Sequence, residues 1–315
     1  MSNNYGMRPP VKNQQARHSN QRAATKSSPS TPPLVSVIIP CYQAEQYITT
    51  AVQSIWAQVN LGQPIEIIAV DDGSTDGTAR LLHHLKVQST IPFFIITHPT
   101  NRGVASARQS GVAAARGQFI LWQDADDQAH PKRLAMLLAG WYQHEKKLSS
   151  PSSANNNPTK LAAIGSGFYI VAGQKIKHGK TPTAFIDANY LPHYLTHHGK
   201  AVATDITNYH CQPLAIHFPT LLVRRSLYDQ FAYRPWPLAE DHDWLYRLLE
   251  SGLTVINLPK RLYYYRKHGA SLTRRHADKL ILGAMVRLSS LCRSLHLPEP
   301  LFPLPRGGLS HRSSG

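Results

Sequence analysis

Short apolar runs alternate with stretches of helical spacing along the first half of the chain. Four runs have the length and continuous hydrophobicity of strands buried on both faces: residues 35–39, 65–70, 93–97 and 119–122. The segments between them favour helices, at residues 44–58, 75–88 and 103–116. Strand and helix alternating three times predict right-handed βαβ units and a mostly parallel sheet of the α/β class.

The second half of the chain has a looser pattern. A helix is expected at 131–145, where Pro131 suits a first turn, and the Ser-, Pro- and Asn-rich stretch 148–159 is typical of a surface loop. The other expected elements are a strand at 162–172, a helix at 241–251 that ends before Gly252, a strand at 254–258 and a helix at 275–296. The apolar stripe of the last helix either packs onto the domain or lies on a membrane surface.

The formal charge of +16 comes mostly from the two ends of the chain. Residues 1–33 hold five Lys/Arg and no acid, and residues 260–315 hold eleven Lys/Arg against two acids. The segment 34–259 is nearly neutral at +2. Basic ends suit an anionic membrane leaflet, nucleic acid or simple solubility, and the three interpretations stay open here.

Several classes of protein are disfavoured by composition. No apolar run approaches the roughly 20 residues that span a bilayer, and the N-terminus lacks the apolar segment of a signal peptide. The cysteines are far apart and form no metal-ligand spacing, and the histidine pairs match none either. These features predict a cytoplasmic location.

The most informative polar cluster is Asp124-Ala-Asp126-Asp127, which directly follows the apolar run that ends at Trp122. Acidic side chains crowded at the end of a buried strand repel one another and are costly to desolvate. A divalent metal held by one or two carboxylates and by substrate phosphates offsets that cost. Because open α/β sheets bind ligands beyond the carboxyl ends of their strands, the cluster predicts a metal-dependent site for a phosphorylated molecule.

Two further loops at predicted strand ends carry residues suited to a ligand. Asp72 either accepts hydrogen bonds from a base or ribose while Ser74 or Thr75 caps the next helix, or it belongs to a plain Asx-type turn with Asp76 as the cap. Arg108 lies near a helix N-terminus, where a cation is unfavourable for the helix alone. It either meets an anion such as a diphosphate or is a solvated surface residue.

Other phosphate chemistries fit the sequence poorly. Phosphatases of the haloacid-dehalogenase type also place Asp-x-Asp after a strand, but on their first strand and with Thr or Val where this chain has Gln128. The chain contains no Gly-x-x-x-x-Gly-Lys-Ser/Thr loop and no Gly-x-Gly-x-x-Gly fingerprint. ATPase and dehydrogenase activities are therefore not expected.

Six motifs in fixed order make a more specific pattern. They are Val35-Ser-Val-Ile-Ile-Pro-Cys-Tyr42, Val70-Asp-Asp-Gly-Ser-Thr-Asp76, Asn101-Arg-Gly-Val-Ala-Ser-Ala-Arg108, Asp124-Ala-Asp-Asp127, Glu240-Asp-His-Asp-Trp-Leu-Tyr-Arg247 and Tyr265-Arg-Lys-His-Gly-Ala-Ser271. This combination resembles family 2 glycosyltransferases over most of residues 34–275. The resemblance implies a GT-A fold (a Rossmann-like, mostly parallel sheet flanked by helices, here with a helical C-terminal extension), a nucleotide-sugar donor, Mn²⁺ or Mg²⁺, and inversion at the anomeric carbon.

The resemblance also implies roles for single residues. Asp241 would be the general base, although Glu240 and Asp243 stay open as alternatives, and Asp126 would ligate the metal with His268 as a weaker candidate. Tyr42 and Asp72 would meet the nucleobase. The full donor-binding set comprises Pro40, Tyr42, Glu45, Asp72, Arg108, Asp124, Ala125 and Asp126. The acceptor-side or supporting set comprises Glu240, Asp243 and Trp244.

The expected organisation follows from these roles. The parts are a disordered basic tail (1–33), a nucleotide-sugar-binding half (34–145), a flexible loop (146–160), an acceptor-binding and catalytic-base half (161–272), an amphipathic helix (273–297) and a disordered tail (298–315). The expected function is transfer of a sugar to a glycan or lipid-linked hydroxyl acceptor in envelope glycan or polysaccharide synthesis. The alternative is a non-catalytic scaffold that binds a nucleotide sugar or glycan. Membrane contact through the basic ends is a further expectation, and a nucleic-acid partner is disfavoured.

Overall fold

The computed structural model describes residues 32–58, 62–148, 160–179, 185–186, 216–236 and 239–269, together with positions 286, 289, 293 and 296. The statements that follow concern these residues. Almost all of the two expected tails, most of the expected 146–160 loop and most of the expected C-terminal helix lie outside them.

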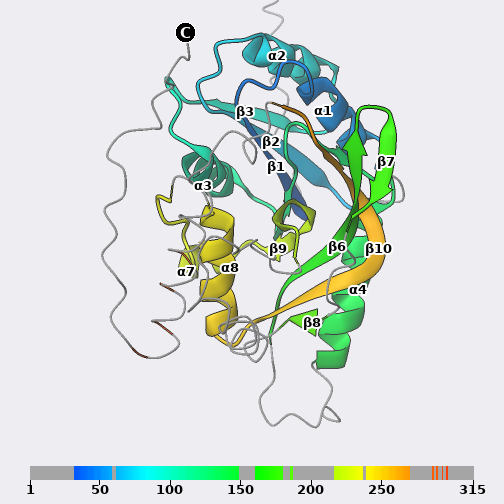
Figure 1. The fold of residues 1–315 in the computed structure, drawn as a ribbon, viewed down its shortest axis with the longest axis vertical. Helices are drawn as coiled ribbons and strands as arrows, with labels where there is room; N and C mark the ends of the chain where they lie inside the picture. The colour runs from blue at the N-terminus through cyan, green and yellow to red at the C-terminus, as the bar shows by residue number, and fades with distance from the viewer. Residues whose placement is uncertain are drawn as a thin grey trace, which may run out of the picture. The chain divides into compact units, whose positions relative to one another are not determined.

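The first half of the chain forms the predicted βα units (Figure 1). The elements are β1 (Val35–Cys41), α1 (Ile48–Trp56), β2 (Ile65–Asp71), α2 (Thr78–Gln88), β3 (Phe93–Thr97), α3 (Val104–Ala114) and β4 (Phe119–Trp122). β1 pairs in parallel with both β2 and β4, and β2 pairs in parallel with β3. The parallel α/β prediction is therefore confirmed for this half.

The second half adds a mixed continuation of the same sheet. Its elements are β5 (Gln128–Ala129), α4 (Arg133–Leu148), β6 (Leu161–Ala172), β7 (Lys175–His178), β8 (Phe185–Ile186), a 3₁₀ turn (Phe218–Thr220), β9 (Leu222–Arg224), α7 (Leu227–Gln230), α8 (Glu240–Glu250) and β10 (Thr254–Arg266). The strand order is β3-β2-β1-β4-β9-β6-β10-β5, with β7 beside β6 and β8 beside β10. β9 runs antiparallel to both β4 and β6, so it joins the two halves.

Two apolar cores cover the two faces of the sheet. Residues of α3, α7 and α8 pack in one core, and residues of α1, α2 and α4 pack in the other. The helix α3 lies unusually close to the sheet at Gly111, where an added Cβ would clash with Ile38 on β1. A small residue at this point therefore lets α3 pack closely against the sheet, so that the polar residues at the start of α3 lie near the carboxyl ends of the strands.

Two expectations for the second half need correction or refinement. The strand expected at 254–258 is too short, because β10 continues past Pro259 to Arg266. The strand accommodates the proline through register shifts on either side of Arg261 against β6. For the expected C-terminal helix, Val286 is fully buried and Arg293 pairs with Glu250 of α8 at 2.7 Å, so these positions pack onto the domain.

Candidate functional site

Three carboxylates converge in the loop that follows β4. Oxygen atoms of Asp124, Asp126 and Asp127 all lie within 4.8 Å of one another. Burial raises the pKa of Asp124 to about 7, although the nearby Arg108 guanidinium opposes the shift. Burial and the neighbouring carboxylates also raise the pKa of Asp127 well above its usual range. Charge repulsion of this kind is relieved when a cation binds.

Residues at the end of β10 form hydrogen bonds with the loop that follows β4. The backbone N–H of Asp124 donates to the Tyr263 hydroxyl at 3.1 Å, and Arg266 Nε donates to the Asp126 carbonyl at 2.9 Å. His268 Nε2 lies 2.8 Å from Asp126 Oδ2. The structure therefore brings His268 to the carboxylate that was predicted to hold the metal. Tyr263 and Arg266 were missed from the sequence, because nothing in it tells which residues of β10 reach the loop.

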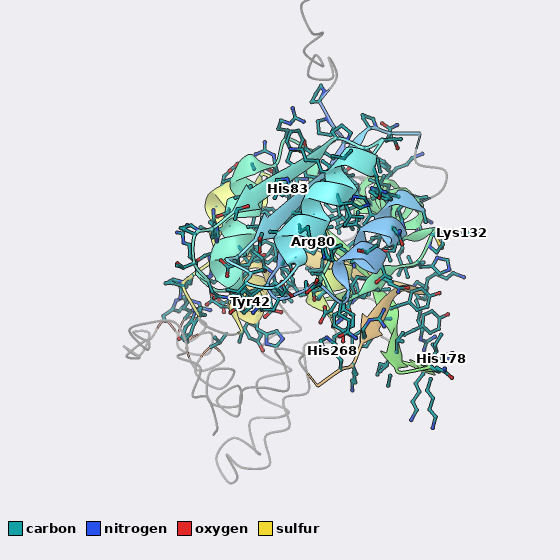
Figure 2. All side chains as sticks on the ribbon, turned by 90° about the horizontal axis from the view of Figure 1, so that it is seen from above. Tyr42, Arg80, His83, Lys132, His178 and His268 are labelled. Atoms are coloured by element: carbon teal, nitrogen blue, oxygen red, sulfur yellow. The ribbon has the colours of Figure 1, made fainter. Side chains whose placement is uncertain are left out.

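In the loop after β1, Tyr42 is exposed, whereas Glu45 is held by a hydrogen bond and an ion pair. Tyr42 is 38% exposed, and Figure 2 places it on the same side of the molecule as His268. Pro40 lies within β1 and is half-buried. Glu45 Oε2 accepts a hydrogen bond from the Gly77 backbone at 3.0 Å, and Oε1 lies 3.4 Å from Arg80 Nη2. Glu45 thus anchors this loop to the start of α2.

Asp72 is buried, and its carboxylate braces the loop before α3. Oδ1 lies 2.5 Å from His98 Nδ1 and accepts from the Arg102 backbone at 3.0 Å, while Oδ2 accepts from the Gly103 backbone at 2.8 Å. The other ring nitrogen of His98 lies 2.9 Å from the Ser110 hydroxyl on α3. The carboxylate thus fixes the loop that precedes α3, and its contact with a nucleobase stays a prediction.

Of the two alternatives for the start of α2, the structure favours Asp76 over Ser74 or Thr75. Ser74 Oγ accepts a hydrogen bond from the Gln43 backbone at 3.0 Å instead of capping the helix. Asp76 Oδ1 accepts from the Thr78 backbone at 3.0 Å at the helix start. The Ser74 backbone N–H donates to Asp71 Oδ1 at 3.1 Å, which is the Asx-type turn considered as the alternative. This turn belongs to Asp71 and leaves Asp72 in its separate position.

Arg108 lies in the core beneath the site rather than at its surface. Its guanidinium forms a hydrogen-bonded ion pair with Glu240 on α8, and Nη2 is 3.9 Å from Asp124 Oδ1. The guanidinium carbon sits 4.7 Å from the Phe218 ring centroid and 5.5 Å from that of Trp122. A solvated surface position is therefore wrong. In this structure Arg108 links the two acidic parts of the site, and its contact with the nucleotide stays a prediction.

The first turn of α8 carries three carboxylates, two of which are buried and paired. Glu240 pairs with Arg108, and Asp243 pairs with Arg247 at 2.9 Å across one helical turn. Arg247 thus forms a structural ion pair within α8. Asp241 is half-exposed and belongs to neither pair. Of the three candidate bases, it is the carboxylate with a side open to an acceptor.

The electrostatic surroundings of Asp241 favour its charged form. Burial acts to raise the pKa of this carboxyl, but the positive charge of His242 and Arg108 outweighs it and lowers the pKa below its ordinary value. The His242 backbone N–H also donates to Asp241 Oδ1 at 2.8 Å. Asp241 is therefore ionised at neutral pH, as a general base must be before it accepts a proton.

Three further residues line or support this region. His217 was missed because it lies in the least patterned part of the sequence. Its ring centroid lies 4.3 Å from that of Phe168 in a tilted arrangement, and burial lowers its pKa to about 4. Trp244 is fully buried, stacks on Tyr228 at 4.9 Å and donates its Nε1–H to the Phe231 carbonyl at 2.6 Å, so it supports the site from the core. Ala125 is 8% exposed and packs in the core below the acidic loop.

The donor set of the acidic loop fits a hard divalent cation. Carboxylate oxygens are the ligands that Mg²⁺ and Mn²⁺ prefer, and Asp124, Asp126 and Asp127 supply one each within 4.8 Å. Asp124 and Asp126 are half-exposed, so this side of the cluster is accessible. Asp127 is fully buried and accepts a hydrogen bond from the Arg266 backbone at 2.6 Å. Asp124 and Asp126 are therefore the better-placed ligands.

Comparison with known proteins agrees with the fold and with the motifs. The glycosyl transferase family 2 profile matches residues 36–188. An uncharacterized glycosyltransferase of Haemophilus influenzae is 29% identical over 242 residues, which are 75% of this chain and 66% of that protein. The chain is thus similar to glycosyl transferase family 2 over residues 36–188, and its fold is of the GT-A type.

Two solved structures share this fold. Staphylococcus aureus TarS (residues 1–349), in complex with UDP-GlcNAc, has a TM-score of 0.59 and 18% identity. The mannosyltransferase PcManGT of Pyrobaculum calidifontis, in complex with GDP-Man and Mn²⁺, has a TM-score of 0.53 and 18% identity. The matches cover 82% and 86% of this chain and 66% of each neighbour. The chain therefore spans about two thirds of the length of these proteins, as it does for the Haemophilus relative.

Proposed function

We propose that this protein is an inverting, metal-dependent glycosyltransferase that moves a sugar from a nucleoside-diphosphate sugar to a hydroxyl acceptor. The observation that carries the proposal is the junction of two acidic clusters through Arg108, which pairs with Glu240 and lies 3.9 Å from Asp124. This arrangement joins a metal-competent loop to the helix that presents Asp241. Both are needed for glycosyl transfer with a deprotonated acceptor.

In the proposed reaction, the acceptor hydroxyl oxygen attacks the anomeric carbon from the side opposite the diphosphate. The new C–O bond forms as the bond to the diphosphate oxygen breaks, and that oxygen keeps the electron pair. Asp241 accepts the hydroxyl proton, so the products are the glycoside, the nucleoside diphosphate and a protonated Asp241. Inversion at the anomeric carbon follows from this single displacement.

The donor side of the proposal rests on the acidic loop and its surroundings. Asp126, with Asp124, would hold a Mn²⁺ or Mg²⁺ ion, which when bound neutralises charge on the departing diphosphate. His268 lies against Asp126 and would contact the same phosphates. Tyr42, exposed at the end of β1, would stack on the nucleobase. UDP-GlcNAc and GDP-Man in the structural neighbours support a nucleotide sugar as the class of donor.

The acceptor side lies toward β6 and the 3₁₀ turn. The rings of Phe168, His217 and Tyr265 lie together, with centroids 4.3 to 6.1 Å apart, and all three are half-exposed. His217 is also close enough to Asp241 for their charges to interact. Aromatic faces beside the base would receive the apolar face of a sugar. We assign this region to a glycan or lipid-linked acceptor of envelope polysaccharide synthesis, following the family resemblance; the cytoplasmic location stays a prediction.

The test is a screen of nucleoside diphosphates and nucleotide sugars by thermal unfolding, with and without Mn²⁺. Ligand that binds only the folded protein raises the melting temperature by mass action. We expect one nucleotide series to raise it, with a larger effect in Mn²⁺, and the Asp126→Ala variant to lose the Mn²⁺ dependence. A metal-independent shift without turnover would favour the scaffold alternative, and no shift with any nucleotide would contradict the proposed donor class.

A further inference from the structure

The β6–β7 hairpin presents an exposed apolar residue between two lysines. All four residues of β7 are exposed, and Ile176 is 61% exposed. Ile176 pairs directly with Val171 of β6, so both side chains lie on one face of the hairpin. Lys175 and Lys177 flank Ile176 on the opposite face. Their long stems can reach round the edge of a two-stranded hairpin while their charges stay in water.

A row of rings continues the Ile176 face across the sheet. Tyr169 pairs with His178, and their ring centroids are 5.6 Å apart. Tyr169 stacks on Tyr264 of β10 at 5.1 Å, and Tyr264 stacks on His130 at 6.2 Å. His178 is exposed and the other three rings are half-exposed. Tyrosines with one apolar side and one wet end are typical of the boundary between water and lipid.

The two segments that build this surface carry positive charge without any acid. Residues 160–179 contain three Lys/Arg, residues 254–269 contain four, and neither segment contains Asp or Glu. Lys267 is exposed, and its backbone N–H donates to the Val171 carbonyl at 2.8 Å, so it lies beside the hairpin. This local excess of positive charge is not seen in the sum over residues 34–259, which is nearly neutral. It gives the surface the charge that complements an anionic partner.

The surface also lies on the side of the molecule that holds the site. In Figure 2, His178 of the hairpin and His268 beside the acidic loop are both near the lower margin of the ribbon, and Lys132, which follows His130, is at its right. Among the described residues, no helix is long and apolar enough to cross a membrane. A surface contact is therefore the kind of membrane association that the described part of the chain can make.

We propose that the β6–β7 hairpin and the adjoining end of β10 dock on an anionic lipid surface. Lys175, Lys177 and Lys267 would face the headgroups, and Ile176 would enter the boundary between headgroups and acyl chains. We favour a bilayer over a nucleic acid as the partner for two reasons. The exposed apolar residue Ile176 lies between Lys175 and Lys177, and the rings of Tyr169 and Tyr264 extend the same face of the sheet. The inference is independent of the proposed reaction.

The test is co-sedimentation of the full-length chain with vesicles of phosphatidylcholine alone or of phosphatidylcholine and phosphatidylglycerol in equal parts. We expect binding only to the anionic vesicles. The double variant Lys175→Gln/Lys177→Gln should bind about 25-fold more weakly at low salt, from about 1 kcal/mol for each lysine near an anionic surface. Ile176→Ser should lose several-fold in affinity, and its loss should persist at high salt, which screens charge but strengthens apolar burial.

The matched control is Lys146→Gln/Lys147→Gln, which removes the same charge from the last turn of α4. Because these lysines lie at the end of α4 away from His130, the control should stay within about twofold of the parent. Unchanged vesicle binding in the hairpin variant, or an equal loss in the control, would overturn the proposal. So would binding of a single-stranded oligonucleotide that Ile176→Ser leaves intact, combined with no binding to anionic vesicles. Circular dichroism melting checks that each variant is folded.

Discussion

The two acidic clusters of this protein have the same number of carboxylates but opposite surroundings. Asp124, Asp126 and Asp127 crowd within 4.8 Å of one another, and burial raises the pKa of two of them. In the first turn of α8, two of three carboxylates are each paired with an arginine. The first cluster is therefore a crowd of carboxylates, whereas in the second two of the three carboxylates are held by arginines, although burial raises the pKa of Glu240 to about 7 as well.

The difference shows how one residue type can serve two purposes. A cluster without enough cations has an affinity for an added one, which suits a metal and a diphosphate. A cluster in which two carboxylates are paired with arginines leaves one carboxylate outside these pairs, Asp241, whose pKa its neighbours lower. Arg108 belongs to both clusters, since it pairs with Glu240 and approaches Asp124. The placement of arginine thus distinguishes the proposed metal-binding cluster from the proposed base cluster.

The largest expected effect follows from Asp241→Asn, which removes the base but keeps the shape of the side chain. Loss of a general base typically costs 10²–10⁴ in rate, so we expect turnover to fall roughly 10³-fold while donor affinity stays within about twofold. Steady-state kinetics with varied donor measures both. Because the amide cannot accept the proton at any pH, raising the pH should not restore the rate. Recovery at high pH would place the base elsewhere.

Breaking the pair between the clusters should cost stability. Glu240→Met leaves the buried Arg108 without its carboxylate, and removing one partner of a buried ion pair typically costs roughly 3–5 kcal/mol. The double variant Arg108→Met/Glu240→Met should regain most of that loss, because no uncompensated charge remains. Urea unfolding of both variants measures their free energies of unfolding, and the difference shows how strongly Arg108 and Glu240 stabilise each other. Equal stability of the single and double variants would show that the pair contributes little.

Matched carboxylate-to-amide changes in the two clusters should differ. Asp243→Asn weakens a charge-assisted pair with Arg247 and should destabilise the protein by about 2 kcal/mol. Asp127→Asn removes charge from the crowded cluster and keeps an oxygen to accept from the Arg266 backbone, so the metal-free protein should unfold at an equal or higher temperature. Differential scanning calorimetry in the presence of a metal chelator compares the unfolding temperatures of the two variants. The reverse order would contradict the proposed charge balance.

A smaller effect is expected from pH through His217. Burial lowers its pKa from 6.5 to about 4, so between these values the unfolded chain binds the proton more readily than the folded protein. Stability should therefore be complete above pH 6.5 and be lost progressively as the pH falls toward 4. His217→Gln should remove this part of the pH dependence, seen as a flatter melting temperature between pH 4 and 6.5. An unchanged slope would assign the dependence to other groups.

The sequence predicted the β1–β4 half well, because each strand there is a continuous apolar run. β1, β2 and β4 are almost wholly buried as expected, whereas β3 was wrongly expected to be buried on both faces and is exposed at Phe94 and Thr97. The loops at the strand ends were also found, since Asp72, Asp124 and Asp126 stand directly after such runs. The second half was harder to predict. Pro259 made β10 seem to stop early, and short strands such as β9 carry too few residues to show a period.

Long-range pairing is what the sequence could not supply. Arg108 and Glu240 are separated by 132 positions, and only the fold brings them together. The same holds for the hydrogen bond from Asp124 to Tyr263 across 139 positions. A buried arginine and an anion-binding arginine have the same local sequence, so spacing alone could not distinguish a positioning role from a contact with the nucleotide.

The most direct test of the two-cluster account compares Asp126→Ala with Asp241→Asn for Mn²⁺-dependent nucleotide binding and for turnover. The account predicts that Asp241→Asn keeps the Mn²⁺-dependent rise in melting temperature with the cognate nucleotide but loses turnover, whereas Asp126→Ala loses both. Both proteins should unfold cooperatively without ligand. Loss of the Mn²⁺-dependent rise in Asp241→Asn, or its retention in Asp126→Ala, would contradict the division between metal-binding and base clusters.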